Sequence, residues 1–73
     1  MRKTSPRIVF GKRLRELRLE RGISQEKLAE MANLHRNYVG VLERGGQSAS
    51  LDAICKLASA LKVRAGELLA NLP

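Results

Sequence analysis

The stretch over 25–44, Gln-Glu-Lys-Leu-Ala-Glu-Met-Ala-Asn-Leu-His-Arg-Asn-Tyr-Val-Gly-Val-Leu-Glu-Arg, decides the fold of this chain. Its apolar residues recur at helical spacing. The period breaks at Asn33, a residue type that tolerates the left-handed backbone of a tight turn. We expect one helix over 25–32 and a second over 35–44, with Ala29 where the two cross closely. Their shared apolar side consists of Leu28, Ala32, Leu34, Val39 and Leu42.

Polar and cationic side chains cover the opposite side of the second expected helix. Two short helices with one apolar and one polar side, joined by a tight turn, are typical of a helix-turn-helix. In that motif the second helix enters the major groove of DNA. The pattern therefore predicts double-stranded DNA as a partner.

Before this pair, apolar residues at helical spacing predict a longer helix over 8–21. Gly22 fits the left-handed end of that helix, and Ser24 is suited to cap the next one. Residues 1–7 read as a flexible basic arm, and 8–73 as a single DNA-binding domain. The apolar residues of the first helix are Phe10, Leu14 and Leu17.

After the helix pair, Gly45 and Gly46 predict a helix end, and Ser50 is suited to cap a helix over 51–61. A last short helix is expected from 65 to 69 or 70. The chain is thus predicted to be all-α, a compact bundle of five helices without strands. The inward stripe of the fourth helix is expected to consist of Leu51, Ile54, Leu57, Ala58 and Leu61.

Length and composition limit what this chain can be. Its 73 residues suffice for one domain. One cysteine and one histidine, far apart, can form neither an internal disulfide nor a zinc cluster, and they suit a reducing cytoplasm. No apolar run has the length of a membrane span, and no signal peptide follows the basic start. We expect a cytoplasmic protein without metal, cofactor or membrane partner.

The charge is strongly positive and unevenly spread. The formal net charge is +7, and the first 21 residues hold eight Lys or Arg against two Glu. Such a domain attracts polyanions. By charge alone, the polyanion could be nucleic acid, a membrane surface or an acidic protein.

Four separated motifs in register resemble the lambda-repressor-like, or XRE-type, helix-turn-helix family. They lie at 11–18, 22–29, 42–45 and 58–63. The resemblance covers about residues 8 to 70 and implies the five-helix fold of that family.

Within the family, residues 34–40 and 50–54 are similar to the controller proteins of bacterial restriction–modification systems, which are small homodimers. The chain departs from them at Gln47, where they often carry Arg, and at Asn37, where Thr is common. Both departures leave the operator sequence open.

The resemblance implies base contacts from one face of the second helix of the pair. Arg36 can grip guanine through two hydrogen bonds, Asn37 can grip adenine, and Val41 can touch a thymine methyl. We also expect Tyr38 and His35 to contact DNA. The alternatives are a solvated polar face, a Tyr38 that only packs and a His35 that caps the helix.

Two further groups are expected to touch the DNA backbone. Ser24 and Gln25 stand at a helix N-terminus, where exposed amides and the helix dipole favour anions. In the family the matching Gln touches a phosphate, and Ser24 can act as the N-cap at the same time. Arg44, Gln47 and Ser48 follow the second helix of the pair and are expected to contact phosphates, which positions the protein without reading sequence.

Arg18 and Glu43 are expected to form an ion pair, as the matching residues do in the family. We interpret this pair as architectural, because it would orient the second helix of the pair. Cys55 is expected to be a packed or partly exposed thiol, since no neighbouring base or cation activates it. No catalytic constellation is present, so the sequence predicts a protein that is not an enzyme.

Apolar residues near the C-terminus, Val63, Leu68 and Leu69, are expected to form a two-fold dimer interface by family analogy. The alternative is that they only close the monomer core. A dimer would place two recognition helices about 34 Å apart, one turn of DNA, and would require a pseudo-palindromic operator.

With no segment for a ligand-binding domain, we expect no small-molecule effector, so that protein concentration is the regulated variable. The controller resemblance implies early activation of its own gene and the endonuclease gene, followed by repression. An activator would also contact RNA polymerase. The alternatives are a phage-type or other small repressor, or the antitoxin of a toxin–antitoxin pair.

Overall fold

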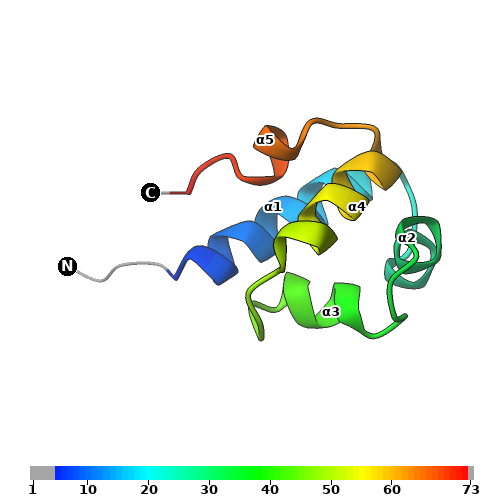
Figure 1. Ribbon diagram of the computed structural model, residues 1–73, viewed down its shortest axis with the longest axis horizontal. Helices are drawn as coiled ribbons and strands as arrows, with labels where there is room; N and C mark the ends of the chain where they lie inside the picture. Colours follow the sequence, from blue (N-terminus) through cyan, green and yellow to red (C-terminus); the bar gives the residue numbers. More distant parts are fainter. Residues whose placement is uncertain (1–4, 73) are drawn as a thin grey trace.

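The computed structural model describes residues 5–72, which form five helices and no strand. Figure 1 shows α1 and α4 crossing the middle of the molecule, with α3 below them, α2 at one end and α5 above. The predicted all-α class is confirmed. The helices are α1 (Pro6–Glu20), α2 (Gln25–Ala32), α3 (Tyr38–Glu43), α4 (Leu51–Leu61) and α5 (Ala65–Leu68).

The first helix begins at Pro6, two residues earlier than predicted. Proline is tolerated at the first helical position because its missing N–H would have no helical partner there. The carbonyl oxygen of Ser5 accepts hydrogen bonds from the N–H groups of Ile8 and Val9. Residues 6 and 7, assigned to the basic arm, therefore form the first turn of α1. Residues 1–4 of that arm lie outside the described residues.

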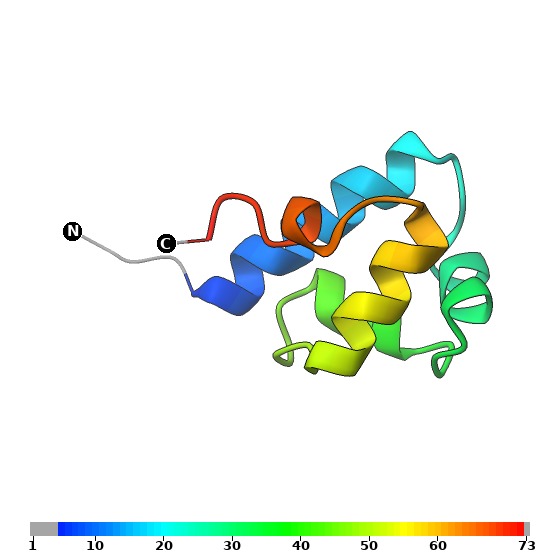
Figure 2. The ribbon, with the colours of Figure 1, turned by 45° about the horizontal axis from the view of Figure 1, so that its top comes forward.

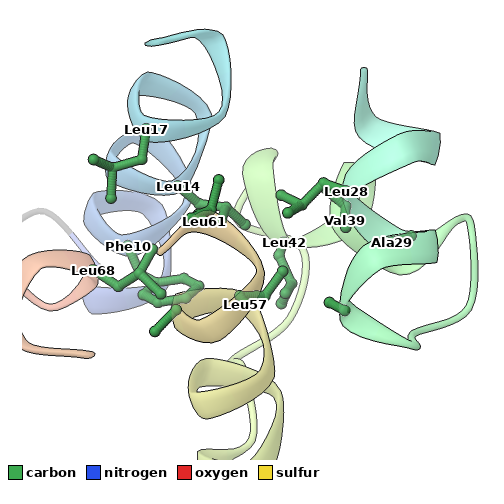
Figure 3. Packing of buried hydrophobic residues seen from close by; sticks show 12 residues of the cluster. Phe10, Leu14, Leu17, Leu28, Ala29, Val39, Leu42, Leu57, Leu61 and Leu68 are labelled. Atoms are coloured by element: carbon green, nitrogen blue, oxygen red, sulfur yellow. The ribbon is translucent and has the colours of Figure 1, made fainter. Parts of the chain in front are cut away.

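One hydrophobic core joins all five helices. Figure 3 shows side chains of α1 and α4, such as Leu14 and Leu61, meeting at its centre, and Leu28 of α2 beside Val39 of α3. The helix-turn-helix is thus held from behind by α1 and α4. The cluster consists of Phe10, Leu14, Leu17, Leu28, Ala29, Ala32, Val39, Leu42, Leu57, Ala58, Leu61 and Leu68.

The predicted inward stripe of α4 is wrong at its first residue. Leu51 is 75% exposed, whereas Ala53, absent from the predicted stripe, is buried. The first turn of α4 lies at the edge of the core, so only a small side chain is covered there. Leu57, Ala58 and Leu61 are buried as expected.

Left-handed residues reverse the chain after α1, α2, α3 and α4; Gly22 after α1 has φ 67°, as predicted, and the residues after α2 and α4 are not glycine. Asn33 has φ 57° after α2, as predicted, and the N–H of Leu34 donates to the carbonyl of Ala29 at 2.9 Å. Lys62 has φ 60° after α4, which the sequence did not indicate, because lysine has no particular tolerance for this conformation. The reversals after α2 and α4 direct an apolar residue, Leu34 or Val63, back onto the core.

The last helix, α5, lies against both α1 and α4 (Figure 2). Long side chains of α1 also hold the C-terminal half. Arg13 donates to the carbonyl of Glu67 at 2.9 Å, and Arg21 donates to the carbonyl of Leu61 at 2.8 Å. Two of the cations counted as attracting polyanions therefore also satisfy carbonyls at the ends of α4 and α5.

Candidate nucleic-acid interface

The N-terminus of α2 forms one side of the candidate interface. The Ser24 hydroxyl accepts a hydrogen bond from the N–H of Lys27 at 3.0 Å, so the predicted N-cap is confirmed. Glu26 lies in the first turn, where a carboxylate is favoured by the helix dipole. Gln25 is the first residue of the helix and is partly buried.

The segment over 35–37 is a turn, not the first turn of a helix, so the predicted start of α3 at His35 is wrong. The Nδ1 of His35 accepts a hydrogen bond from the N–H of Asn37 at 3.1 Å, and its carbonyl accepts from the N–H of Tyr38 at 2.9 Å. The second of these bonds closes an i→i+3 turn, so α3 begins only at Tyr38. The three residues His35, Arg36 and Asn37 are exposed.

Arg36 lies over a shallow groove between this turn and α2. The groove is lined by Arg36 together with Ser24, Glu26, Lys27, Glu30 and Leu34. Two carboxylates thus face the same groove as the arginine, and Glu30 also pairs with Lys27 at 3.3 Å. The turn and the α2 N-terminus therefore form one polar surface.

The remaining candidates lie along α3 and just after it. Tyr38 and Val41 are half-buried, and the ring of Tyr38 packs against the core. Arg44, Gln47 and Ser48 are exposed on the segment that leads to α4. Gly45 reverses the chain there with φ 73°. Contacts of all these residues with DNA stay a prediction.

Arg18 and Glu43 form an ion pair between α1 and the end of α3. Arg18 Nε and Nη2 donate to the two carboxylate oxygens of Glu43 at 2.6 and 3.0 Å, and Nη1 donates to the carbonyl of Ile23 at 2.8 Å. Both side chains are nearly buried, at 8% and 3% exposure. The hydrogen bonds to Glu43 raise the pKa of Arg18 above its ordinary value; burial opposes this, and the charge of Glu43 adds to it.

A third member of this cluster was missed from the sequence. Gln25 Nε2 donates a hydrogen bond to Glu43 Oε1 at 3.0 Å, so Glu43 joins α1, α2 and α3. No local pattern signals this contact, because 18 residues separate Gln25 from Glu43. Gln25 thus has a partner within the protein at the place where we expected it to face a phosphate.

The predicted dimer interface is wrong for Leu68. This side chain is fully buried in the core, with 0% exposure, and so cannot also contact a second subunit. Leu69 is 36% exposed and Val63 is half-buried. An apolar hollow beside Leu69, between the start of α1 and the start of α4, was not anticipated; its lining includes Phe10, Ala49, Ile54 and Leu72.

Neither a metal site nor a membrane-spanning helix is found among residues 5–72. No group of three or more His, Cys, Asp or Glu side chains is placed to hold a metal ion. None of the five helices combines the length and apolar character needed to cross a membrane. Cys55 is exposed.

Comparison with known proteins places these features in a family. The chain is 45% identical over 64 residues to control protein C.BamHI of Bacillus amyloliquefaciens, covering 86% of this chain and 79% of that protein. It is 36% identical over 61 residues to control protein C.SmaI of Serratia marcescens, covering 84% and 73%.

A solved structure is similar as well. The restriction-modification controller protein C.AhdI from Aeromonas hydrophila matches with a TM-score of 0.83 and 52% identity, over 85% of this chain and 94% of that one. The helix-turn-helix family profile matches residues 14–68, which include the Arg18–Glu43 pair, both helices of the motif and most of the core. The resemblance seen in the sequence is confirmed: this chain belongs to the XRE-type helix-turn-helix family of transcription regulators.

Proposed function

We propose that this chain is a homodimeric, sequence-specific DNA-binding regulator that controls a restriction–modification operon, including its own gene. One observation carries the proposal. The exposed turn over 35–37 and the capped N-terminus of α2 form a single polar surface, held from behind by the core. The similarity to control proteins supports restriction–modification as the setting.

Arg36 and Asn37 are the proposed readers of base edges. Both side chains are exposed on the turn that leads into α3. Each side chain can form two hydrogen bonds with one base, worth about 1–3 kcal/mol of discrimination. Ser24, Gln25, Arg44, Gln47 and Ser48 are the proposed phosphate contacts, and they would set the register of the protein on the duplex.

Replacing Arg36 by alanine is expected to remove selectivity for the operator. On a labelled duplex carrying the DNA just upstream of the gene, selective affinity should fall roughly 10- to 100-fold per subunit. Affinity for a scrambled duplex should fall far less, since the proposed role of Arg36 is to read a base. The titration is run at two salt concentrations, and the stoichiometry should be two subunits per site.

Arg64→Ala is the matched control, because it removes the same charge from an exposed position at the start of α5. This variant should keep its selectivity. Equal affinity of the wild type for the operator and scrambled duplexes would contradict the proposed function. Selective binding that survives Arg36→Ala would contradict only the role of Arg36.

A second copy of this chain is the proposed partner at the C-terminal face. Leu69 and Val63 remain candidates there, whereas Leu68 belongs to the core. The hollow beside Leu69, with Ile54 and Leu72 in its lining, offers apolar surface for a two-fold contact. The exposed Leu51 on α4 adds further apolar surface.

Leu69→Glu is expected to make the protein monomeric without unfolding it. The exposed side chain can carry a charge in the monomer. In a dimer, two like charges would face each other across a two-fold axis, and both would lose their hydration, so association would be unfavourable. Sedimentation velocity should show the change in mass, and circular dichroism should show an unchanged helix content. Leu19→Glu, at an exposed position of α1, is the control. An unchanged dimer in Leu69→Glu would place the interface elsewhere.

The proposed mode of regulation depends on protein concentration, with no small-molecule effector. Dimerisation before DNA binding makes occupancy rise steeply with concentration, which suits early activation followed by repression. Activation would require contact with RNA polymerase. A neighbouring methylase or nuclease gene would favour this proposal over a phage-type repressor, and a neighbouring toxin gene would favour an antitoxin.

A further inference from the structure

We propose that Gly40 is a positioning residue of the DNA interface, because its missing side chain lets Gln25 and Arg44 converge over α3. The inference rests on the proposed function, since it concerns how this surface holds a DNA phosphate. Gly40 itself touches no base or phosphate in the proposal. It acts through the two side chains that pass over it.

Atoms of two side chains lie unusually close to Gly40. A Cβ atom placed on this residue would lie 3.1 Å from Gln25 Oε1 and 3.1 Å from Arg44 Nη1. Such contacts are tighter than ordinary van der Waals distances, so both side-chain ends would have to move. Gly40 lies inside α3 and is buried. Glycine weakens a helix interior relative to alanine, so the position carries a local cost to stability.

The two atoms that lie over Gly40 are an acceptor, the amide oxygen Oε1 of Gln25, and a donor, Nη1 of Arg44. The amide of Gln25 carries two N–H groups, and one of them donates to Glu43 Oε1 at 3.0 Å. That bond anchors Gln25 to the buried ion pair. In the proposal, the anchored amide oxygen of Gln25 holds one edge of the Arg44 guanidinium, whose other N–H groups are left for a DNA phosphate.

The arrangement explains how Gln25 can serve both the protein and DNA. Its contact with Glu43 ties the start of α2 to the end of α3. Arg44 follows α3 directly and is exposed. A side chain at position 40 would separate Arg44 from Gln25 while leaving the core untouched. The cost of glycine in α3 is thus offset by the alignment of Arg44 with a DNA phosphate.

The test is to compare Gly40→Ala with Gly66→Ala. Gly66 is also a helical glycine, in α5, and within the described part of the chain its added Cβ would meet no atom within 4 Å. Gly66→Ala should melt at or above the wild-type temperature, because alanine favours helix and the added Cβ meets no neighbour among the residues described. Gly40→Ala is compared at a temperature where circular dichroism shows it folded, since its added Cβ displaces two side-chain ends. Only Gly40→Ala should bind the operator duplex more weakly, by about tenfold, which corresponds to one charge-assisted hydrogen bond. The slope of log affinity against log salt should also fall, by about 0.9 for each phosphate that the variant no longer neutralises.

A double-mutant cycle with Gln25→Ala shows whether the effect passes through Gln25. In the Gln25→Ala background, adding Gly40→Ala should cost much less than tenfold. Unchanged affinity and salt slope in Gly40→Ala would overturn the proposal, and so would full additivity with Gln25→Ala. If Gly40→Ala does not fold, the double variant, which lacks one of the two close contacts, is compared with Gln25→Ala alone. There, a loss of affinity as large as tenfold would overturn the proposal.

A measurement without DNA separates this inference from the proposed function. The NMR signals of the Gln25 side-chain amide should shift in Gly40→Ala and stay in place in Gly66→Ala. If the wild type does not discriminate between the operator and scrambled duplexes, the proposed function is wrong, even where the Gln25 amide signal shifts. An amide that does not shift, in a wild type that binds selectively, would overturn only the role of Gly40.

Discussion

Replacing Glu43 by alanine is expected to lower the free energy of unfolding by about 3–5 kcal/mol, the usual cost of removing one partner from a buried ion pair. The guanidinium of Arg18, almost fully buried, would keep only its hydrogen bond to the carbonyl of Ile23. A domain of this length has a total stability of roughly 4–11 kcal/mol. Urea denaturation followed by circular dichroism should therefore show a variant close to unfolding.

The control is the double variant Arg18→Met/Glu43→Leu. Removing both charges leaves no buried ion without a partner, so most of the stability should return. Loss of less than about 1 kcal/mol in Glu43→Ala would show that the pair is weakly buried in solution.

Arg18 should add no pH dependence to the free energy of unfolding near neutral pH. The folded pKa of Arg18 is raised, so its contribution to stability is complete below the ordinary arginine pKa. It is lost only as the pH rises through the raised value. A fall in stability at neutral pH would therefore have to come from other groups.

Gly11→Ala is expected to destabilise the protein by about 3 kcal/mol, the upper part of the range for overpacking a core. A Cβ atom at Gly11 would lie 2.3 Å from the carbonyl oxygen of Leu42 and 2.8 Å from that of Glu43. These are backbone atoms of α3, so α1 and α3 would have to separate. Helix propensity alone predicts the opposite sign, a gain of about 1 kcal/mol. Thermal and urea denaturation decide between the two.

Gly66→Ala is the matched control for this prediction too. It makes the same chemical change in a helix, but no atom of residues 5–72 lies within 4 Å of the added Cβ. It should match or exceed the stability of the wild type. If Gly11→Ala were equally stable, the close approach of α1 to α3 would be wrong.

Local sequence signals predict where several of the helices begin and end. The hydroxyls of Ser24 and Ser50 each cap the helix that follows them, as predicted from residue type and position. Asn33 takes the left-handed turn that its side chain tolerates. Helix periodicity, caps and turns depend on residues a few positions apart, so one sequence suffices to place them.

The contacts within the candidate site could not be predicted from local sequence signals. The pairing of Arg18 with Glu43 was expected only because the chain resembles a family, and the contact itself joins residues 25 positions apart. The start of α3 was misplaced because the N–H of Tyr38 donates to the carbonyl of His35, which closes an i→i+3 turn before the helix begins. Which exposed side chains touch DNA stays a prediction.

By itself, the sequence determined the all-α class, the helix-turn-helix and the family, because these rest on periodicity, caps and motif spacing. The tertiary structure decided which apolar residues are buried: Leu68 fills the core, whereas Leu51 does not. It also decided that Gln25 and Arg18 meet on Glu43. Burial and such contacts depend on how distant helices cross, and the crossing of α1 and α3 is set by the space that a missing side chain leaves at Gly11.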